Sequence, residues 1–193
     1  MFFENLKGTK IILASKSPRR NSLLKEMGLD FEVLIHDVDE SFPQSLCGKD
    51  IASFIAEKKA DPFIDEIDNQ TVIITADTIV YINGEVLGKP GNYEEAFEML
   101  QKLSGQWHQV ITGVCLLSKE KKKVFTSETN VLFKPLSNEE IEYYINNYRP
   151  YDKAGAYGIQ EWIGLVAIEK IDGSYFNVMG LPVQQLYEEL NKF

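Results

Sequence analysis

The chain has 193 residues, of which 44% are hydrophobic and 11% aromatic, so it can bury a substantial core as one domain or two closely packed lobes. Its formal net charge of -9 argues against an extended nucleic-acid surface, because such a surface needs basic residues clustered over a whole face. The first residues carry an early acid, and no run of about 18 apolar residues occurs, so we expect no secretory signal, no membrane span and a cytoplasmic location.

The amino-terminal half alternates predicted strands with helices. Residues 10–14 form a short apolar run that is typical of a buried strand, and a helix is predicted directly after it. Ser17 suits the N-cap of this helix, Pro18 its first position and Gly28 its carboxyl-terminal cap. Further along we expect a strand over 31–34 and a helix over 50–60. A strand over 71–76 precedes Asp77, and another over 78–82 follows it.

The second half is expected to pair its strands as hairpins. Asn83 and Gly84 are a strong turn signal, and a lysine-rich stretch at 119–123 is predicted to be a solvated turn. Ser137 has the form of a capping-box residue that starts a helix. The remaining predicted elements are helices over 93–103, 138–147 and 181–190 and strands over 107–117, 124–133 and 164–171.

This order of elements predicts an α/β fold with a mixed, strongly twisted sheet and flanking helices. No repeat or flexible linker divides the sequence, so we interpret 1–193 as a single domain, with two lobes around a cleft as the arrangement that fits. Cys47 and Cys115 have neither metal-ligand spacing nor disulfide density, and we expect free thiols with packing roles. His36 and His108 belong to no recognisable catalytic pattern and are expected at surface or structural positions.

A basic turn at 15–20 precedes the first predicted helix. Arg19 and Arg20 fall in the first turn, where the helix dipole disfavours each positive charge by on the order of tenths of a kcal/mol unless an anion compensates it. Together with free backbone N–H groups and the hydroxyls of Ser15 and Ser17, they can form a polyphosphate site. The alternative is that both arginines point to solvent or to nearby acids.

Asp77 and Lys89 are candidates for the opposite side of such a site. Asp77 directly follows a run of apolar strand residues, where α/β enzymes place catalytic groups, and it can hold a metal ion, orient water or both. A turn-capping aspartate helped by Thr78 is the alternative. Lys89 lies between a glycine and a proline and suits a fixed charge for phosphate, although a surface lysine is also possible. No Walker loop and no GxGxxG after the first strand is present.

Two further residues are candidates for a metal ion and a base. Glu40, in the acidic stretch 37–40, can supply a second carboxylate to Mg²⁺, or it is part of an ordinary acidic loop. The glycines in 152–160 allow either close approach of the backbone to a ligand or a tight turn. Gln160 has a donor and an acceptor with which to read a base edge.

Three segments resemble the defining motifs of the Maf family of nucleoside triphosphate pyrophosphatases in order and spacing. They are LASKSPRR at 13–20, ADTIVYINGEVLGKP at 76–90 and DKAGAYGIQ at 152–160. The similarity continues through AEKKA, LSG, ITGV and NVMGLP, and so covers nearly the whole chain. It implies cleavage between the α and β phosphates, which yields a nucleoside monophosphate and pyrophosphate with a divalent metal, Mg²⁺ or Mn²⁺.

The resemblance also implies roles for individual residues. Asp77 would be the proton acceptor and, with Glu40, a metal ligand. Arg19, Thr78 and Gln160 would set base specificity, and the glutamine resembles the branch acting on dTTP and UTP rather than the 7-methyl-GTP branch, which has an acid there. The residues implied to contact the triphosphate are Ser15, Arg19, Arg20, Lys59 and Lys89.

Departures from the family and alternative functions bear on the substrate. Glu161 and Trp162 follow Gln160, where glycine is common, and Arg149 stands where an acid is common, which affects the base pocket rather than the phosphate chemistry. The alternatives are the same reaction on a modified purine such as 7-methyl-GTP, or a nucleotide-sensing regulator of septum formation with incidental turnover. The expected partner is a small nucleoside triphosphate, with no nucleic acid or membrane, and the resemblance suggests a homodimer.

Overall fold

The structure is a computed structural model that describes residues 3–193. Its strands are β1 (Lys10–Leu13), β2 (Glu32–Val33), β3 (Thr71–Ile82), β4 (Glu85–Leu87), β5 (Trp107–Leu117), β6 (Lys122–Phe133) and β7 (Ile168–Asp172). They form one seven-stranded sheet in the order β2-β1-β3-β5-β6-β7, and β4 pairs with β3. The pairs β1–β2 and β1–β3 are parallel, whereas β3–β4 and β6–β7 are antiparallel. The predicted mixed α/β sheet is therefore confirmed.

The chain divides into two compact units. The first unit comprises the chain up to Asp77, Thr112–Ser127 and Gly180–Phe193, and the second unit comprises Thr78–Ile111 and Glu128–Met179. Strands β3, β5 and β6 each continue from one unit into the other. Within the described part, 3–193, no helix combines the length and apolar character needed to cross a membrane.

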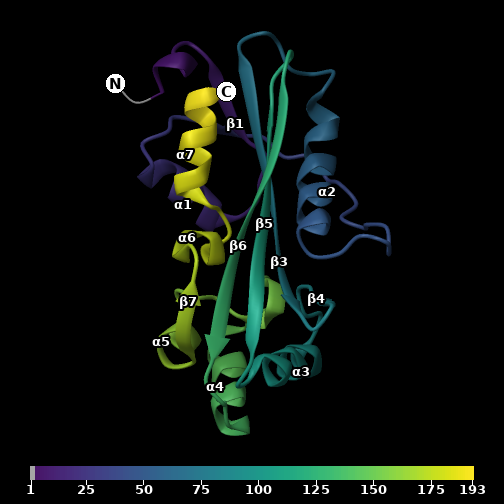
Figure 1. The fold of residues 1–193 in the computed structure, drawn as a ribbon, viewed down its shortest axis with the longest axis vertical. Coiled ribbons are helices and arrows are strands. Elements are labelled where there is room, and N and C mark those ends of the chain that lie inside the picture. Colours follow the sequence, from purple (N-terminus) through teal and green to yellow (C-terminus); the bar gives the residue numbers. More distant parts are fainter. Residues whose placement is uncertain (1–2) are drawn as a thin grey trace. The chain divides into compact units, whose positions relative to one another are not determined.

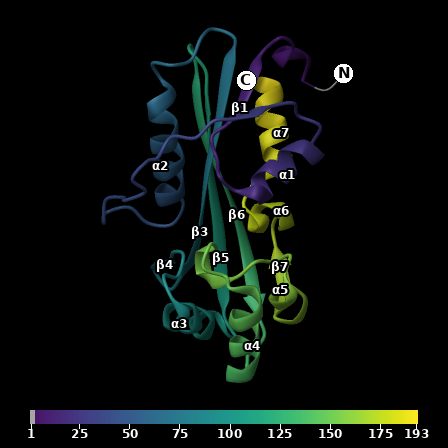
Figure 2. The same cartoon turned by 180° about the vertical axis from the view of Figure 1, so that it is seen from behind.

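The first unit has helices on both faces of its strands. Helix α2 (Lys49–Ala60) lies on one side of β1 and β3, and α1 (Pro18–Glu26) and α7 (Val183–Lys192) lie on the other, as both views show (Figures 1 and 2). Ile12 of β1 and Ile73 of β3 pack against Ala56 of α2 and Phe63 of η2 (Asp61–Phe63). The residues next to them in each strand face the other side of the sheet, because side chains alternate along a strand. A short helix, η1 (Glu4–Leu6), contacts α7.

The local signals around α1 have the roles predicted for them. The Ser17 hydroxyl accepts a hydrogen bond from the Arg20 amide, and Pro18 occupies the first helical position. Gly28 follows the helix with a φ of 79°, a conformation that costs glycine little. Buried Leu23 and Leu24 fix the inner face. The strand, turn and first helix are thus placed as the sequence predicts.

The second unit has an apolar core of its own, against which helices pack. These are α3 (Tyr93–Leu103), α4 (Asn138–Tyr148), η3 (Ala154–Ala156), α5 (Trp162–Val166) and α6 (Tyr175–Met179). The predicted capping box is present at the start of α4, where Ser137 and Glu140 bond reciprocally. Asn83 and Gly84 both have positive φ in the β3–β4 turn, as the hairpin signal predicts.

The predicted strand over 164–171 is wrong in its first half. Residues 162–166 form α5, and only Ile168–Asp172 is a strand. A Cβ on Gly164 would lie 1.9 Å from the backbone oxygen of Ile159, so α5 packs directly on the preceding turn. A run of five apolar residues is too short to show a helical or a strand period, so the sequence alone cannot distinguish this short helix from a buried strand.

The cysteines are both free, as expected, but only one has a packing role. Cys115 is buried among the first-unit core residues, and burial raises its pKa to about 12. Cys47 is exposed, so the expected packing role is wrong for it.

Candidate active site

Most of the predicted site residues lie in the first unit, on four neighbouring parts of the chain. The turn before α1 with the first turn of that helix, the loop after β2, the last turn of α2 and strand β3 contribute them. They are Ser15, Arg19, Arg20, Glu40, Lys59 and Asp77.

Lys59 joins the two predicted acidic residues. Its Nζ lies 2.7 Å from Asp77 Oδ1 and 2.8 Å from Glu40 Oε1. The side chain of Asp77 is only 12% exposed and that of Lys59 17%. A carboxylate buried to this degree is costly unless a cation and hydrogen bonds compensate it. The Lys59 ammonium therefore makes an ionised Asp77 possible inside the protein.

The position of Asp77 corrects one expectation. Two strands were predicted on either side of Asp77, whereas β3 runs without a break from Thr71 to Ile82. An acid within an apolar run indicates the end of a buried strand, because a buried charge without a partner is unfavourable. The compensating Lys59 is 18 residues away in the sequence, so its contact with Asp77 lies beyond local patterning.

Arg20 connects the basic turn to the strand that carries Asp77. Its Nη1 donates to the backbone oxygen of Ala76 at 2.7 Å, and its Nε donates to that of Gly180 at 2.8 Å. Burial lowers the pKa of Arg20, and the negative charges of Asp77 and Glu40 oppose this shift. The guanidinium stays charged at neutral pH, because an arginine pKa starts so far above it. Arg20 thus places a fixed positive charge near both carboxylates.

The turn itself uses part of its hydrogen-bonding capacity internally. Ser15 Oγ accepts from the Ser17 amide at 3.2 Å and from Arg20 Nη1 at 3.4 Å, and the Arg20 amide is bonded to Ser17 Oγ. The predicted site with free backbone N–H groups therefore needs a correction, since these two amides already have partners. The arginine side chains and the Ser15 hydroxyl remain as the groups suited to an anion. Arg19 is half-buried next to them.

The loop that carries Glu40 has no regular secondary structure but is anchored on both sides of that residue. Lys58 Nζ lies 3.3 Å from Asp39 Oδ2 and donates to the Ser41 backbone oxygen at 3.0 Å. Asp39 also accepts hydrogen bonds from the hydroxyl and amide of Ser41, which lower its pKa to about 2. Lys16 adds an ion pair to Asp37 at 2.6 Å. These contacts hold Glu40 close to Lys59.

The two carboxylates suit a divalent cation. Both approach the same Lys59 nitrogen to within 3 Å, so the two carboxylates lie in one small region. Hard oxygen donors are the ligands that Mg²⁺ and Mn²⁺ prefer, and Mg²⁺ usually takes only one or two protein carboxylates. Among residues 3–193, no cluster of three or more His, Cys, Asp or Glu could hold a metal. Phosphate oxygens and water would have to complete the coordination of an ion held by Glu40 and Asp77.

The other predicted residues belong to the second unit. Thr78 is half-buried at the start of this unit's part of β3, and Lys89 and Gln160 are exposed. Lys89 is followed by Pro90, which is buried. It is preceded by Gly88, and the Gly88 backbone oxygen accepts a hydrogen bond from the Gly155 amide at 3.0 Å. The residues on both sides of Lys89 thus have contacts within the second unit, and its role toward phosphate stays a prediction.

Sequence reasoning missed a buried asparagine in this unit. Asn177 is fully buried and donates from Nδ2 to the Val110 oxygen and to Thr129 Oγ1, each at 3.0 Å. Its one signal is that it opens the NVMGLP segment, whose Gly180 supplies the carbonyl to Arg20. A hydrogen bond to a main-chain oxygen leaves no mark on the partner's residue type, so the contacts of Asn177 with Val110 and of Arg20 with Gly180 are not visible in the sequence.

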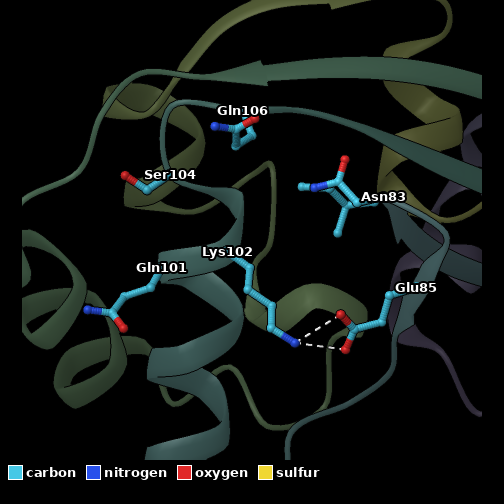
Figure 3. A pocket seen from close by; sticks show the side chains of 7 residues that line it. Asn83, Glu85, Gln101, Lys102, Ser104 and Gln106 are labelled. Atoms are coloured by element: carbon cyan, nitrogen blue, oxygen red, sulfur yellow. Dashed lines mark hydrogen bonds and ion pairs between the residues drawn. The ribbon is translucent and has the colours of Figure 1, made fainter.

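A hollow of about 400 Å³ lies elsewhere on the second unit and contains none of the predicted site residues. Figure 3 shows Lys102 and Glu85 pointing toward one another across it, with the Lys102 nitrogen 2.7 Å from a Glu85 oxygen. Lys102 and Glu85 pair with each other, Gln101 donates to Asn138, and Ser104 Oγ accepts from the Leu136 amide. The hollow is lined by Ile82, Asn83, Glu85, Gln101, Lys102, Ser104 and Gln106.

Comparison with known proteins identifies the family. Residues 10–193 match the family described as Maf-like protein. The chain belongs to the Maf family. A dTTP/UTP pyrophosphatase of Parabacteroides distasonis is 53% identical over 191 residues, which cover 98% of this Maf chain and 99% of that protein. A protein of the same name from Bacteroides fragilis is 53% identical over 189 residues, with 97% and 98% covered.

Among solved structures, the Staphylococcus aureus Ham1 protein matches with a TM-score of 0.49 and 17% identity, covering 65% of this chain and 72% of that one. The family membership confirms the resemblance of the three motifs. In the Maf chain the first of these motifs holds Ser15, Arg19 and Arg20, and the second begins with Ala76 and Asp77. The Arg20 hydrogen bond to Ala76 therefore joins the two motifs directly.

Proposed function

We propose that this Maf-family protein hydrolyses nucleoside triphosphates, preferentially dTTP and UTP, to the nucleoside monophosphate and pyrophosphate. The observation that carries the proposal is the convergence of Glu40 and Asp77 on Lys59 beside the guanidinium of Arg20. Two carboxylates and fixed cations in one place suit a metal-assisted reaction of a polyphosphate. The relatives named dTTP/UTP pyrophosphatase, which match over nearly their full length, support the choice of substrate.

The proposed roles in binding follow from charge. Cationic side chains neutralise the phosphates, and the Ser15 hydroxyl donates a hydrogen bond to them. Lys59, which lies between the two carboxylates, can donate to a phosphate oxygen without leaving Asp77, since an ammonium group has three donors. The proposed triphosphate contacts are Ser15, Arg19, Arg20, Lys59 and Lys89.

In the chemical step, Asp77 accepts a proton from a water molecule as that water attacks the α-phosphorus in line with the leaving group. The bond between the α-phosphorus and the oxygen bridging to the β-phosphorus breaks, and pyrophosphate leaves with that oxygen. Arg20 holds the backbone at Ala76 and so fixes the direction from which Asp77 meets the water. A divalent ion, Mg²⁺ or Mn²⁺, held by Glu40 and Asp77 would supply neutralisation of the charge that builds on the phosphate oxygens.

We propose that base selection depends on Arg19, Thr78 and Gln160. The Gln160 amide has one donor and one acceptor side, which match the acceptor and donor on the edge of uracil or thymine. A pocket that fits a pyrimidine also excludes the larger purines sterically. Gln160→Glu should therefore lower UTP turnover, because the carboxylate has lost the donor.

The test is to incubate the protein with Mg²⁺ and a panel of nucleoside triphosphates, and to measure pyrophosphate and orthophosphate separately. We expect UMP and dTMP with pyrophosphate as the first inorganic product. Orthophosphate as the first product would contradict the proposed site of cleavage. Faster turnover of 7-methyl-GTP would instead assign a modified purine as the substrate, and tight binding without turnover would favour the regulatory function in septum formation.

We further propose that the protein works in the cytosol as a homodimer on a small nucleotide, without nucleic acid or membrane. Light scattering on the purified protein tests the oligomeric state, and a mass of one chain would contradict it. Fractionation of cells that produce the protein tests its location.

A further inference from the structure

A polar network lies directly under the loop that carries Gln160. The Tyr144 hydroxyl of α4 donates to Glu161 Oε2 and accepts from the Gly158 amide at 3.0 Å. Glu161 Oε1 in turn lies 3.0 Å from Lys153 Nζ. A further hydrogen bond from the Glu161 amide to the Gly158 backbone oxygen, 3.0 Å, closes the turn. The network therefore holds the loop at the backbone of Gly158, two residues before Gln160, and at the side chain of Glu161, one residue after it.

The network is largely removed from solvent. Tyr144 is fully buried, and the side chains of Lys153 and Glu161 are 9% and 24% exposed. Burial and the neighbouring Glu161 carboxylate raise the pKa of Tyr144, so its hydroxyl keeps its proton and donates. Hydrogen bonds and ion pairs in such surroundings are stronger than in water, because little water competes for them.

Gly158 is the residue that lets these side chains close on the loop. A Cβ at this position would lie 3.0 Å from Glu161 Cδ and 3.0 Å from Lys153 Cε. A side chain at this position would therefore press on both partners of the Lys153–Glu161 ion pair, and each would have to shift. The absence of a side chain at Gly158 is thus part of the same arrangement.

Gln160 itself is exposed between two anchored neighbours. Ile159 is only 6% exposed and Glu161 belongs to the network, whereas Gln160 faces outward. Fixing the residues on both sides fixes the Cα of Gln160 and the direction of its Cα–Cβ bond. Hydrogen bonds to a base depend on such placement, and a shift of about 1 Å can cost on the order of a hundredfold in rate.

We propose that Glu161, held by Tyr144 and Lys153, is a positioning residue that sets the base selectivity of the Gln160 loop. The inference rests on the proposed function, since it deepens the account of how a pyrimidine triphosphate is chosen. A residue without a carboxylate at position 161 could make neither the ion pair to Lys153 nor the hydrogen bond to Tyr144, so the anchoring of this loop depends on Glu161.

The test uses variants of the full chain that remove the network but leave its shape. In Tyr144→Phe the loop loses the hydroxyl that contacts both Gly158 and Glu161. In Glu161→Gln the pair with Lys153 loses its negative charge, while the second ion pair of Lys153, with Asp152, remains. For each we expect the KM for UTP to rise about tenfold, kcat to change much less, and the ratio of kcat/KM for UTP over CTP to fall. The inhibition constant of inorganic triphosphate, which has no base, should stay at the wild-type value.

The matched control is Tyr143→Phe. Tyr143 is the neighbouring residue on α4, is 48% exposed and packs against Trp162 through its ring, which phenylalanine keeps. This variant should keep the wild-type UTP to CTP ratio. Circular dichroism checks that each variant is folded, and Glu161→Gln serves as the second test if Tyr144→Phe does not fold.

The outcomes distinguish a failure of the positioning role of Glu161 from a failure of the proposed hydrolysis of UTP. Folded Tyr144→Phe and Glu161→Gln variants with wild-type KM and selectivity would overturn the inference. An equal loss for UTP and for inorganic triphosphate would overturn it too, because that result means a general structural role. A wild-type protein that does not hydrolyse UTP contradicts the proposed function, and calorimetric binding of UMP and CMP to the same variants then decides whether the network affects base selectivity.

Discussion

At the scale of single residues, the site depends on how Asp77 is compensated. Its carboxylate pairs with Lys59, and Arg20 supplies a second positive charge nearby. The sequence draws attention to Arg20 and Asp77, because a cation in the first turn of a helix and an acid in an apolar strand are both unusual, whereas Lys59 is implied only by the family resemblance. It does not indicate that Arg20 donates to the oxygens of Ala76 and Gly180, since main-chain acceptors are the same at every position.

The first prediction concerns Asp77. Asp77→Asn keeps the size of the side chain but loses the ability to accept a proton, so we expect turnover of UTP to fall by about a thousandfold or more while UTP still binds. The measurement is pyrophosphate release, with UTP binding followed by calorimetry. A variant that keeps the wild-type rate would show that Asp77 is not the base.

At the scale of elements, the end of α2 and the loop over 36–48 work together. Lys58 and Lys59 are adjacent on the helix, and one anchors the loop backbone around Glu40 while the other pairs with the Glu40 carboxylate. The sequence predicts α2 from its apolar face, but a loop without regular structure has no pattern from which its anchors could be read. The role of Lys58 therefore depends on the structure.

The second prediction tests this anchor. In Lys58→Met the loop loses its contacts to Asp39 and Ser41, so Glu40 becomes less ordered and we expect Mn²⁺ binding to weaken about three- to tenfold. Mn²⁺ binding is measured by electron paramagnetic resonance in the absence of nucleotide. Lys49→Met, at the exposed start of the same helix, is the control and should bind Mn²⁺ like the wild type. Equal weakening in both variants would mean a general charge effect.

The third prediction concerns the close contact of α2 with β5. A Cβ on Gly113 would lie 2.2 Å from the backbone oxygen of Ala52, and no side-chain rotation can relieve this clash. Gly113→Ala should therefore lower the free energy of unfolding by about 1–3 kcal/mol, as overpacking of a core does. Urea unfolding measures the change. Gly88→Ala is the control, because a Cβ there meets nothing within 4 Å, and its stability should stay within about 0.5 kcal/mol of the wild type.

Elements were predictable where caps and periodicity agreed, as in α1, α3 and α4. The failures are short pieces such as α5 and α6, which have too few residues for a period to show. Their conformation is set by packing, as the contact of Gly164 with Ile159 illustrates. Sequence reasoning therefore worked best for elements whose own residues specify their ends.

At the scale of the whole molecule, the two units share strands β3, β5 and β6. Neither unit can lose these strands without breaking the ladder hydrogen bonds of the other, so we expect one cooperative unfolding transition for the whole chain. The single domain over 1–193 stays a prediction, which one cooperative transition would support. Such a transition also means that a group buried in one unit affects the stability of the whole chain.

His108 provides such a group and the fourth prediction. It is 2% exposed in the second unit, lies 2.8 Å from the Tyr157 hydroxyl and packs edge-on against Phe133, and burial lowers its pKa from 6.5 to about 4. The unfolded chain therefore binds a proton at His108 between pH 6.5 and 4 that the folded chain does not, so this contribution to stability is present above pH 6.5 and is lost as pH falls. Between pH 7 and 5 we expect a loss of about 2 kcal/mol from this residue.

Urea unfolding at a series of pH values measures this loss, with His108→Gln as the control. Glutamine can keep a hydrogen bond to Tyr157 but does not titrate, so the variant should lose less stability than the wild type between pH 7 and 5, whatever its stability at pH 7. The carboxylates of the chain add the same slope to both proteins, and the difference between the two slopes isolates His108. Equal slopes would mean that the pKa of His108 is the same in the folded and the unfolded chain. Two separate transitions would contradict the expectation of cooperative unfolding through the shared strands.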